Sequence, residues 1–492
     1  MLAVIFGPAI QTTAAPNPRW SSPLSIGTDN GGDVQNPQVV MDSRGNAVAV
    51  WSQSNGSRYD VYANRYVSGA GWGNVSVVET DDAGDAREVQ VAVDSTGQVV
   101  AVWSQHDGTQ YNIYANRYTD GAGWTSATLL ETEDFGPAHS PQIAVDRAGN
   151  AVVMWAQTAG WPVNIWANRY VAGMGWGAAT LIETGASPAY SPQVAVDSAG
   201  NAIAVWSQHD GVSDTIYANR FVIGRGWETA RSIGTGGAFA PQVAMDPQGN
   251  AIAVWHQWDT SALVPVTSVY SSRHSVGSGW ENATKIEEDD WGGVSPPQIA
   301  VDAAGNGIAV WRQADATGGR VWTNQYRAGA GWGAANRIDT NPLLPAHAPQ
   351  IAMDSSGTAV VVWFQEDGIA QRGYVHARRN SPTSGWGMTS LLSTDFSGYV
   401  SSPQVAMDPG GKAIAVWVQT EGLNETVYAS RFVPDAIDES DQSNVVAIAL
   451  SGIALLVATS VLLHLSLRRG RRRRRPEPVE TGFGGGPRGK DE

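Results

Sequence analysis

Two histidine–aspartate pairs occupy matching positions of the sequence, and an imidazole beside a carboxylate is a common arrangement for acid–base catalysis. The pairs are His106-Asp107 and His209-Asp210, and a glycine follows each of them. An Asp-Gly step is typical of a tight turn, and no nucleophile accompanies either pair. We therefore interpret both pairs as loop residues and assign no catalytic residue.

Residues better suited to binding lie in segments that vary from one repeat of the chain to the next. These segments combine acidic residues with aromatic and imidazole side chains, as around Glu133-Asp134 and Asp289-Asp290. The candidate ligand-binding residues are Phe135, His139, Tyr190, Phe239, Trp291, His347, Phe396 and Tyr399. Variable loops on a rigid scaffold are where proteins usually bind ligands. We expect these loops to ring the mouth of a central channel; ordinary solvated loops are the alternative.

An aspartate recurs at one place in all eight repeats, within an Asp-x-x-Gly sequence. The residues are Asp42, Asp94, Asp146, Asp197, Asp246, Asp302, Asp354 and Asp408. A calcium loop needs several oxygen ligands at alternate positions, which Asp-Ser-Ala-Gly-Asn does not supply. An aspartate that accepts hydrogen bonds from its own turn, with a glycine at positive φ, explains the pattern better. No metal site and no cofactor are therefore expected.

Arginines recur at the end of a later strand in seven repeats. They are Arg65, Arg117, Arg169, Arg220, Arg273, Arg378 and Arg431, with Gln325 in the sixth repeat. Because this strand end and the aspartate turn are expected on the same face, we predict that many of these arginines pair with a turn aspartate. The alternative is an arginine cluster that binds an acidic sugar.

One repeating unit positions all of these residues, and residues 192–208 represent it. An apolar strand, a tight turn at Asp197 and a second apolar strand lead to Trp206-Ser207-Gln208. The tryptophan of this Trp-x-Gln ending returns every 49 to 56 residues, at Trp51, Trp103, Trp155, Trp206, Trp255, Trp311, Trp363 and Trp417. We expect the tryptophan to fill the space between neighbouring repeats and the glutamine to bond the neighbour's backbone. A lectin with one aromatic sugar site per repeat is the alternative.

Each repeat also contains a third strand signal, such as residues 113–118, and a fourth that opens with Gly-Trp. Four short strands in about 52 residues are typical of a propeller blade. The last repeat lacks its fourth strand, whereas a Gly-Trp-like segment at Trp20 precedes the first repeat. We therefore predict an all-β, eight-bladed propeller of four-stranded blades, closed by the N-terminal strand.

Composition limits the classes of partner. The net charge is −15 and cysteine is absent, so disulfides and Cys-based zinc sites are impossible. An acidic body does not suit nucleic acid, which needs a basic surface.

The two ends of the chain differ from the repeats. We divide it into a signal-peptide-like segment (1–16), which could be truncated, a propeller ectodomain (17–434) and a linker (435–444), followed by a transmembrane helix (445–467) and a basic, then disordered tail (468–492). Residues 445–467 contain no Asp, Glu, Lys or Arg and, as a helix, would span about 34 Å. The arginines that follow predict a cytoplasmic C-terminus, with the propeller outside a single-pass cell-membrane anchor.

The motif from Val196 to Trp206 resembles the first two strands of NHL-type and bacterial β-propeller repeats, which have a similar Val-Asp-x-x-Gly-Asn turn. The resemblance spans residues 20–432 and departs from that pattern in the Trp-x-Gln ending and in the longer blade. It implies the propeller fold and binding roles more often than catalysis, and it transfers no catalytic residue.

Together these observations predict a membrane-anchored extracellular propeller that binds a surface glycan or protein through its variable-loop face, rather than an enzyme. The alternative is a carbohydrate-active hydrolase or lyase with its site at the channel mouth, or a repeat lectin. An enzyme would need acid and base groups that converge at the mouth, whereas a lectin would repeat a shallow aromatic–arginine site around the ring.

Overall fold

The computed structural model describes residues 19–434 except 29–31, 81–82, 133–135, 159, 161, 184, 260–265, 289–291, 317, 342, 369–371, 394–397 and 423. Residues Arg19–Pro434 form one compact unit. The predicted signal-like segment, linker, transmembrane helix and tail lie outside the described residues. Within the part of the chain that is described, no helix has the length and apolar character needed to cross a membrane.

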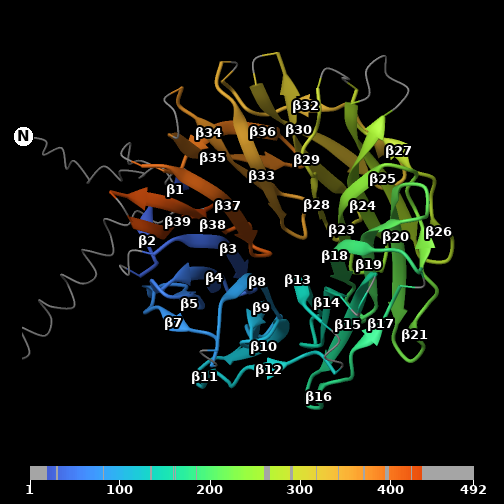
Figure 1. Cartoon of the computed structure of the whole chain (residues 1–492). Helices are drawn as coiled ribbons and strands as arrows, with labels where there is room; N and C mark the ends of the chain where they lie inside the picture. The colour runs from blue at the N-terminus through green and yellow to red at the C-terminus, as the bar shows by residue number, and fades with distance from the viewer. Residues whose placement is uncertain are drawn as a thin grey trace, which may run out of the picture. The chain divides into compact units, whose positions relative to one another are not determined.

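The described residues form eight antiparallel sheets, arranged as the blades of a propeller (Figure 1). The innermost strands of neighbouring blades contact one another around the ring. The predicted all-β, eight-bladed fold is therefore confirmed. We number the four strand positions of each blade from the first, which is innermost, to the fourth, which is outermost.

The strands of the first four blades are as follows. Blade 1 comprises β3 (Val34–Met41), β4 (Ala47–Ser54), β5 (Tyr59–Val67), β6 (Gly71–Trp72) and β7 (Ser76–Val77). Blade 2 comprises β8 (Ala86–Val93), β9 (Val99–His106), β10 (Tyr111–Thr119), β11 (Gly123–Trp124) and β12 (Thr128–Leu129). Blade 3 comprises β13 (Ala138–Val145), β14 (Ala151–Thr158), β15 (Val163–Val171), β16 (Gly175–Trp176) and β17 (Thr180–Leu181). Blade 4 comprises β18 (Ala189–Val196), β19 (Ala202–His209), β20 (Asp214–Val222), β21 (Gly226–Trp227) and β22 (Arg231–Ser232).

The last four blades repeat this order. Blade 5 comprises β23 (Ala238–Met245), β24 (Ala251–Asp259), β25 (Val266–Ser275), β26 (Gly279–Trp280) and β27 (Thr284–Lys285). Blade 6 comprises β28 (Gln298–Val301), β29 (Gly307–Asp315), β30 (Gly318–Arg327), β31 (Gly331–Trp332) and β32 (Asn336–Arg337). Blade 7 comprises β33 (Ala346–Met353), β34 (Ala359–Glu366), β35 (Gly373–Ser381) and β36 (Gly385–Leu391). Blade 8 comprises β37 (Val400–Met407), β38 (Ala413–Glu421), β39 (Asn424–Val433), β1 (Arg19–Trp20) and β2 (Leu24–Ser25).

The two ends of the described chain close the ring in blade 8. β1 pairs with β39 through Arg19↔Val433 and Trp20↔Phe432, and β2 continues the same edge. Ser430 Oγ also donates a hydrogen bond to Ser21 O at 2.7 Å. The N-terminal strand thus supplies the outermost position that the last repeat lacks, as predicted, and leaves no gap between the first and last blades.

The core consists of the second strands, which neighbouring blades cover on both faces. The eight Trp-x-Gln tryptophans are fully buried. Each indole Nε1 donates to the Oε1 of the glutamine two residues later, at 2.8 to 3.2 Å. The tryptophan therefore packs between blades as predicted, and the glutamine satisfies its one polar atom.

The glutamine amide then joins one blade to the preceding blade. Gln157 Nε2 lies 3.1 Å from Glu131 Oε2, and Gln208 Nε2 lies 2.9 Å from Glu183 Oε2. Glu131 also accepts a hydrogen bond from the Ile113 backbone N–H within its own blade. The glutamine was predicted to bond the backbone of the neighbouring blade. At these junctions its main partner is instead a buried carboxylate.

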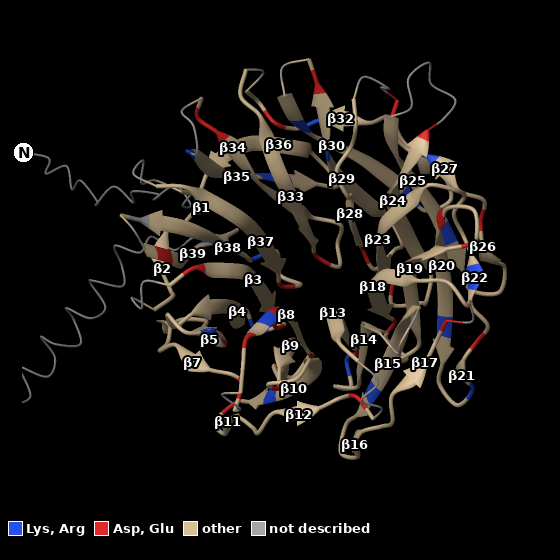
Figure 2. Cartoon of the chain, in the orientation of Figure 1, with Lys and Arg blue, Asp and Glu red and all other residues tan. Residues whose placement is uncertain are grey.

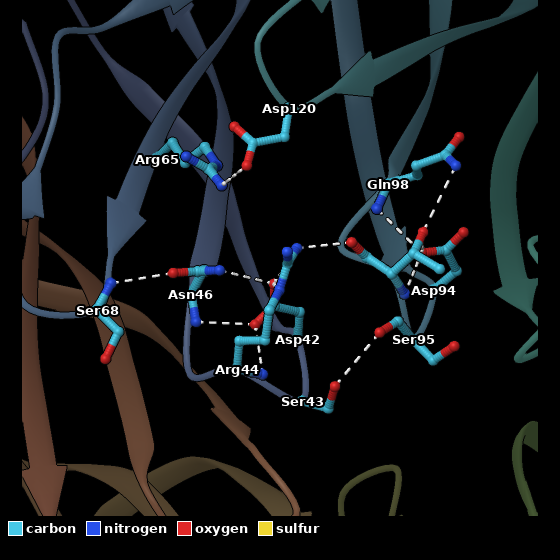
Figure 3. Close-up of polar contacts among 11 residues, drawn as sticks. Asp42, Ser43, Arg44, Asn46, Arg65, Ser68, Asp94, Ser95, Gln98 and Asp120 are labelled. Carbon is cyan, nitrogen blue, oxygen red and sulfur yellow. Dashed lines mark hydrogen bonds and ion pairs between the residues drawn. The ribbon is translucent and has the colours of Figure 1, made fainter.

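The turn aspartates have the structural role predicted for them. Asp42 Oδ1 accepts hydrogen bonds from the backbone N–H groups of Arg44 and Asn46, both at 2.9 Å (Figure 3). All eight aspartates accept equivalent bonds from the residues two and four positions later. Ser43 Oγ reaches Ser95 O of the next turn at 3.3 Å, so neighbouring turns also contact one another.

An unpredicted bulge interrupts the first strand of seven blades. The residue at the bulge has a φ of 46° to 56°, at Asn36, Glu88, Ser140, Ser191, Ala240, Ala348 and Ser402. In blade 6 the equivalent residue is Pro296, whose ring holds φ negative. The bulge cannot form there, and β28 is accordingly shortened to four residues. Bulges of this kind bend a strand and change the direction of its side chains.

Candidate functional site

The variable-loop face is formed by the loops between blades and by the loops that join second to third strands. Four of the predicted binding residues share one position in the first strands of their blades: His139, Tyr190, Phe239 and His347. Tyr399 precedes β37 and is 42% exposed. Phe135, Trp291 and Phe396 lie outside the described residues.

The sequence analysis missed the residue at this shared position in blade 2, which is Arg87. Arg87 pairs across the sheet with Ser104 as His139 pairs with Ala156. The sequence spacing could have identified it, because Arg87 precedes the tryptophan of the next Trp-x-Gln ending by the same number of residues as His139 does in blade 3. Arg87 therefore contributes a cation to the same ring of side chains.

Two neighbours hold the Arg87 guanidinium in place. Its Cζ lies 4.0 Å from the ring centroid of Tyr59, and its Nη2 lies 2.8 Å from Asp85 Oδ2. Asp85 Oδ1 in turn accepts a hydrogen bond from the Tyr59 N–H at 2.9 Å. Burial alone would raise the pKa of Asp85, but these bonds outweigh it and lower the pKa below its usual value. Asp85 is thus an anion that fixes the cation.

The Tyr59 hydroxyl is kept protonated. It lies 3.0 Å from Gln35 Nε2 and 3.4 Å from Asp33 Oδ2. Burial and the negative charge of Asp33 raise the pKa of Tyr59. A phenol in this environment can donate a proton or a hydrogen bond but is a poor base near neutral pH.

Imidazole and phenol rings continue this group into blade 3. The Tyr111 ring centroid lies 5.1 Å from that of His106 and 5.2 Å from that of His139. His106 Nδ1 accepts a hydrogen bond from the Gly108 N–H at 3.1 Å, so a neutral His106 has its proton on Nε2. The backbone N–H of His106 also donates a hydrogen bond to the backbone oxygen of Asp85 at 2.9 Å, which connects His106 to the residues around Arg87.

We call this group the mouth cluster. It comprises Tyr59, Asp85, Arg87, His106, Tyr111 and His139. It combines a fixed cation, two phenols and two imidazoles on one side of the ring, which are groups able to bind an anion and to transfer protons.

The two His-Asp pairs do not act as acid–base pairs. Asp107 accepts hydrogen bonds from the Thr109 hydroxyl, the Gln110 N–H and Asn112, and these bonds hold the pKa of Asp107 well below its usual value. Asp210 accepts equivalent backbone bonds in the matching loop. Both aspartates therefore close turns, as their Asp-Gly steps predict.

Polar side chains also occupy the shared strand position in blades 4 and 7, at Tyr190 and His347. His347 Nε2 lies 2.7 Å from Glu366 Oε1, and the His347 ring stacks on Phe364. Burial, with the nearby Asp214 carboxylate, raises the pKa of Tyr190. Among the described residues no group of three or more His, Asp and Glu side chains is arranged to hold a metal ion.

The predicted pairing of the recurrent arginines with turn aspartates is wrong. The Arg117 guanidinium stacks on the Tyr170 ring of the next blade, at 4.0 Å, and donates to Gln98 at 2.8 Å. Arg65 does form an ion pair, at 3.3 Å, but with Asp120 in another class of turn (Figure 3).

The member of the arginine series in blade 7 was also misassigned. Cross-strand pairing places Arg379 opposite Val360, as Arg117 lies opposite Val100. Arg379 stacks on Phe432 of the next blade, whereas Arg378 donates to the carbonyls of Gly387 and Ile338. In blades 1, 2, 3, 5, 7 and 8 the arginine of this series lies over an aromatic ring of the next blade, whereas blade 6 has Gln325 at this position. Figure 2 shows how basic and acidic residues are distributed over the blades.

No protein-family profile matches the sequence, and no curated protein matches it. Solved structures resemble the propeller at low sequence identity. A Dyadobacter fermentans protein of unknown function shares 12% identity, over 85% of this chain and 99% of that one, with a TM-score of 0.45. A polysaccharide lyase of family PL25, an ulvan lyase, shares 12% over 75% and 96%, with a TM-score of 0.47. A Penicillium chrysogenum α-L-arabinanase shares 14% over 70% and 92%, with a TM-score of 0.37. These likenesses concern the fold alone.

These findings correct two expectations from the sequence. The sequence predicted a binding protein that acts through its variable loops, rather than an enzyme. The similar folds that were found include carbohydrate-active enzymes, a lyase and an arabinanase among them, so that prediction is contradicted. The similarity to NHL-type repeats in particular is likewise unsupported, and only the propeller itself stands.

Proposed function

We propose that the protein is a carbohydrate-active enzyme, a lyase that cleaves an acidic polysaccharide at the mouth cluster. The observation that carries the proposal is the Arg87 guanidinium, held by Tyr59 and Asp85 beside the His106, Tyr111 and His139 rings. A fixed cation beside proton-transfer groups is what elimination from a uronate requires.

The chemistry follows from the sugar. Arg87 would neutralise the uronate carboxylate, and the Nε2–H of His106 would donate a hydrogen bond to it, which acidifies the neighbouring C5–H. His139 would accept the C5 proton while the C4–O bond breaks, a C4=C5 double bond forms, and the Tyr111 hydroxyl gives a proton to the leaving oxygen. The products are an unsaturated uronate and a new reducing end.

A hydrolase would need two carboxyl groups across the scissile bond, one of them protonated. In the mouth cluster Asp85 is engaged by Arg87 and Tyr59, and its lowered pKa keeps it ionised. The cluster therefore favours elimination over hydrolysis.

The test is to incubate the full-length protein with alginate, pectate, ulvan and hyaluronan. Ultraviolet absorbance reports the unsaturated product, and a reducing-end assay reports total cleavage. His139→Ala should lower kcat by about 10²- to 10⁴-fold. The matched control is His347→Ala, which removes the residue at the same strand position in blade 7 and should leave the rate near wild type. Reducing ends without the absorbance, or equal loss in both variants, would refute the elimination.

We also propose that residues 445–467 cross the cell membrane, with the propeller outside and the basic residues from Arg468 in the cytoplasm. Their uncharged length and the positive charges that follow support this topology. Protease added to intact cells should digest the propeller and spare an epitope tag at the C-terminus. Protection of the propeller would contradict it.

A further inference from the structure

A cavity of one kind recurs at the junctions between blades, toward their outer strands. One cavity, of about 410 Å³, lies between blades 3 and 4, and another, of about 360 Å³, lies between blades 1 and 2. Both are within the size range of small-molecule sites. Each opens where the outermost strand is interrupted, as at residues 177–179 between β16 and β17.

The two cavities have the same construction. Each is lined by a third-strand asparagine, by the glycine after the outer Gly-Trp, and by a tryptophan of the next blade. These residues are Asn168, Gly177 and Trp227 in one cavity, and Asn64, Gly73 and Trp124 in the other.

A buried acceptor without a partner lines each cavity. Asn168 is 3% exposed, and its Nδ2 donates to Leu130 O and Gly177 O at 2.9 and 3.0 Å, which fixes the orientation of the amide. Its Oδ1 has no hydrogen-bond partner among the described residues. The Oδ1 of Asn64, which is 4% exposed, is likewise unpaired. An unpaired buried oxygen is unfavourable, so a hydrogen-bond donor from a ligand would stabilise it.

Blade 2 shows what that partner could be. There a threonine, Thr125, replaces the glycine, and its hydroxyl donates to Asn116 Oδ1 at 2.7 Å. The Arg117 backbone N–H donates to the same oxygen, also at 2.7 Å. Asn116 Nδ2 makes the same carbonyl bonds as in blade 3. The chain thus supplies a hydroxyl at this junction, whereas Gly73 and Gly177 leave the position open.

We propose that the junctions with an open glycine are binding sites for neutral sugar units, separate from the mouth cluster. A sugar hydroxyl would donate to the asparagine Oδ1 as Thr125 does, and the ring would pack against Trp227 or Trp124. A neutral sugar fits because the arginine that lines each cavity is already engaged: Arg65 lies 3.3 Å from Asp120, and Arg169 lies over the Phe221 ring of the next blade. The sites lie beside the Gly-Trp turns, which belong to the face opposite the mouth loops.

Blade 6 has the same asparagine and glycine. Asn324 is 2% exposed, its Oδ1 is unpaired, and Gly333 occupies the glycine position. Three sites around one ring would hold a long polysaccharide with greater avidity than one site could.

The decisive variant is Gly73→Thr/Gly177→Thr/Gly333→Thr. A Cβ at Gly177 would lie 3.5 Å from Arg169 O and 3.6 Å from Asn168 Oδ1, which is ordinary contact, and Gly73 and Gly333 offer similar space. Each threonine should therefore occupy the sugar position without unfolding the blade. Binding of cellohexaose, mannohexaose and a galactose-based hexasaccharide to the full-length protein would be measured by calorimetry, with the melting temperature measured alongside.

We expect at least one of these sugars to bind the wild type, the triple variant to bind it at least tenfold more weakly, and the melting temperature not to fall. The reverse change, Thr125→Gly, should add one site per chain to the measured stoichiometry. Absence of binding to all three sugars, or unchanged binding by the triple variant, would overturn the proposal. Arg87→Gln at the mouth should leave this binding unchanged, so the outcome is separable from that for the lyase.

Discussion

The junction between blades 2 and 3 offers a quantitative test of how the ring is held together. In Gln157→Leu, the Trp155 Nε1, which is fully buried, loses its acceptor at 3.0 Å, and the Glu131 carboxylate loses its donor at 3.1 Å. An unpaired buried donor costs about 1–3 kcal/mol, and a hydrogen bond to a charged group contributes about 1.5–3 kcal/mol. We therefore expect the free energy of unfolding to fall by roughly 3–5 kcal/mol.

The matched control is Gln257→Leu in blade 5. Gln257 accepts from Trp255 Nε1 at 3.0 Å in the same way, but its Nε2 meets the neutral hydroxyl of Thr235 at 2.7 Å. Its loss should be smaller by about 1 kcal/mol, because no charge is left behind. Urea unfolding followed by tryptophan fluorescence measures both, with the slope of the transition checked for a change in cooperativity. Equal losses in the two variants, or a loss below about 1 kcal/mol in Gln157→Leu, would refute the assigned role of the carboxylate.

Three further substitutions test other features. Gly149→Ala should lower the melting temperature, because Gly149 has a φ of 81° and a Cβ there would lie 2.8 Å from Asp94 Oδ2; an unchanged melting temperature would contradict this. Burial lowers the pKa of His274 to about 4, so stability should fall as pH drops from about 6.5 to 4, where only the unfolded chain is protonated. Urea midpoints across this range should show a flatter profile for His274→Tyr, and matching profiles would argue against the assignment. Arg117→Met should lower the free energy of unfolding by about 1–2 kcal/mol, because the contact with Tyr170 is lost. The same urea assay measures this change, and an unchanged free energy would show that the contact does not stabilise the fold.

Much of the fold was predictable because one packing problem recurs in every blade. The Trp-x-Gln ending and the turn aspartate depend on contacts within a few residues, which a repeat displays directly. The partner of Gln157 was not predictable in this way, since Glu131 lies 26 residues earlier and in another blade. The register of Arg379 was not predictable from spacing. The loop before β35 is longer than in most other blades, so the number of residues between Trp363 and this arginine differs from that in the other repeats.

The candidate site was predictable only in part. His139, Tyr190, Phe239 and His347 share a strand position that sequence spacing reveals. The role of Arg87 depends on its contact with Tyr59, which belongs to another blade. The residues that form the candidate site could therefore be identified only from the structure. The predictions for both chain ends remain predictions.

The closure of the ring has a mechanical consequence. Arg19 lies opposite Val433, so the chain enters and leaves the propeller at the same end of one antiparallel ladder. Tension applied between these two points would break the bonds of β1, and then those of β2, one after another rather than all at once. The pairing of β1 and β2 with β39 should therefore break at a lower force than a strand pair loaded in shear. It should also break before any other blade unfolds.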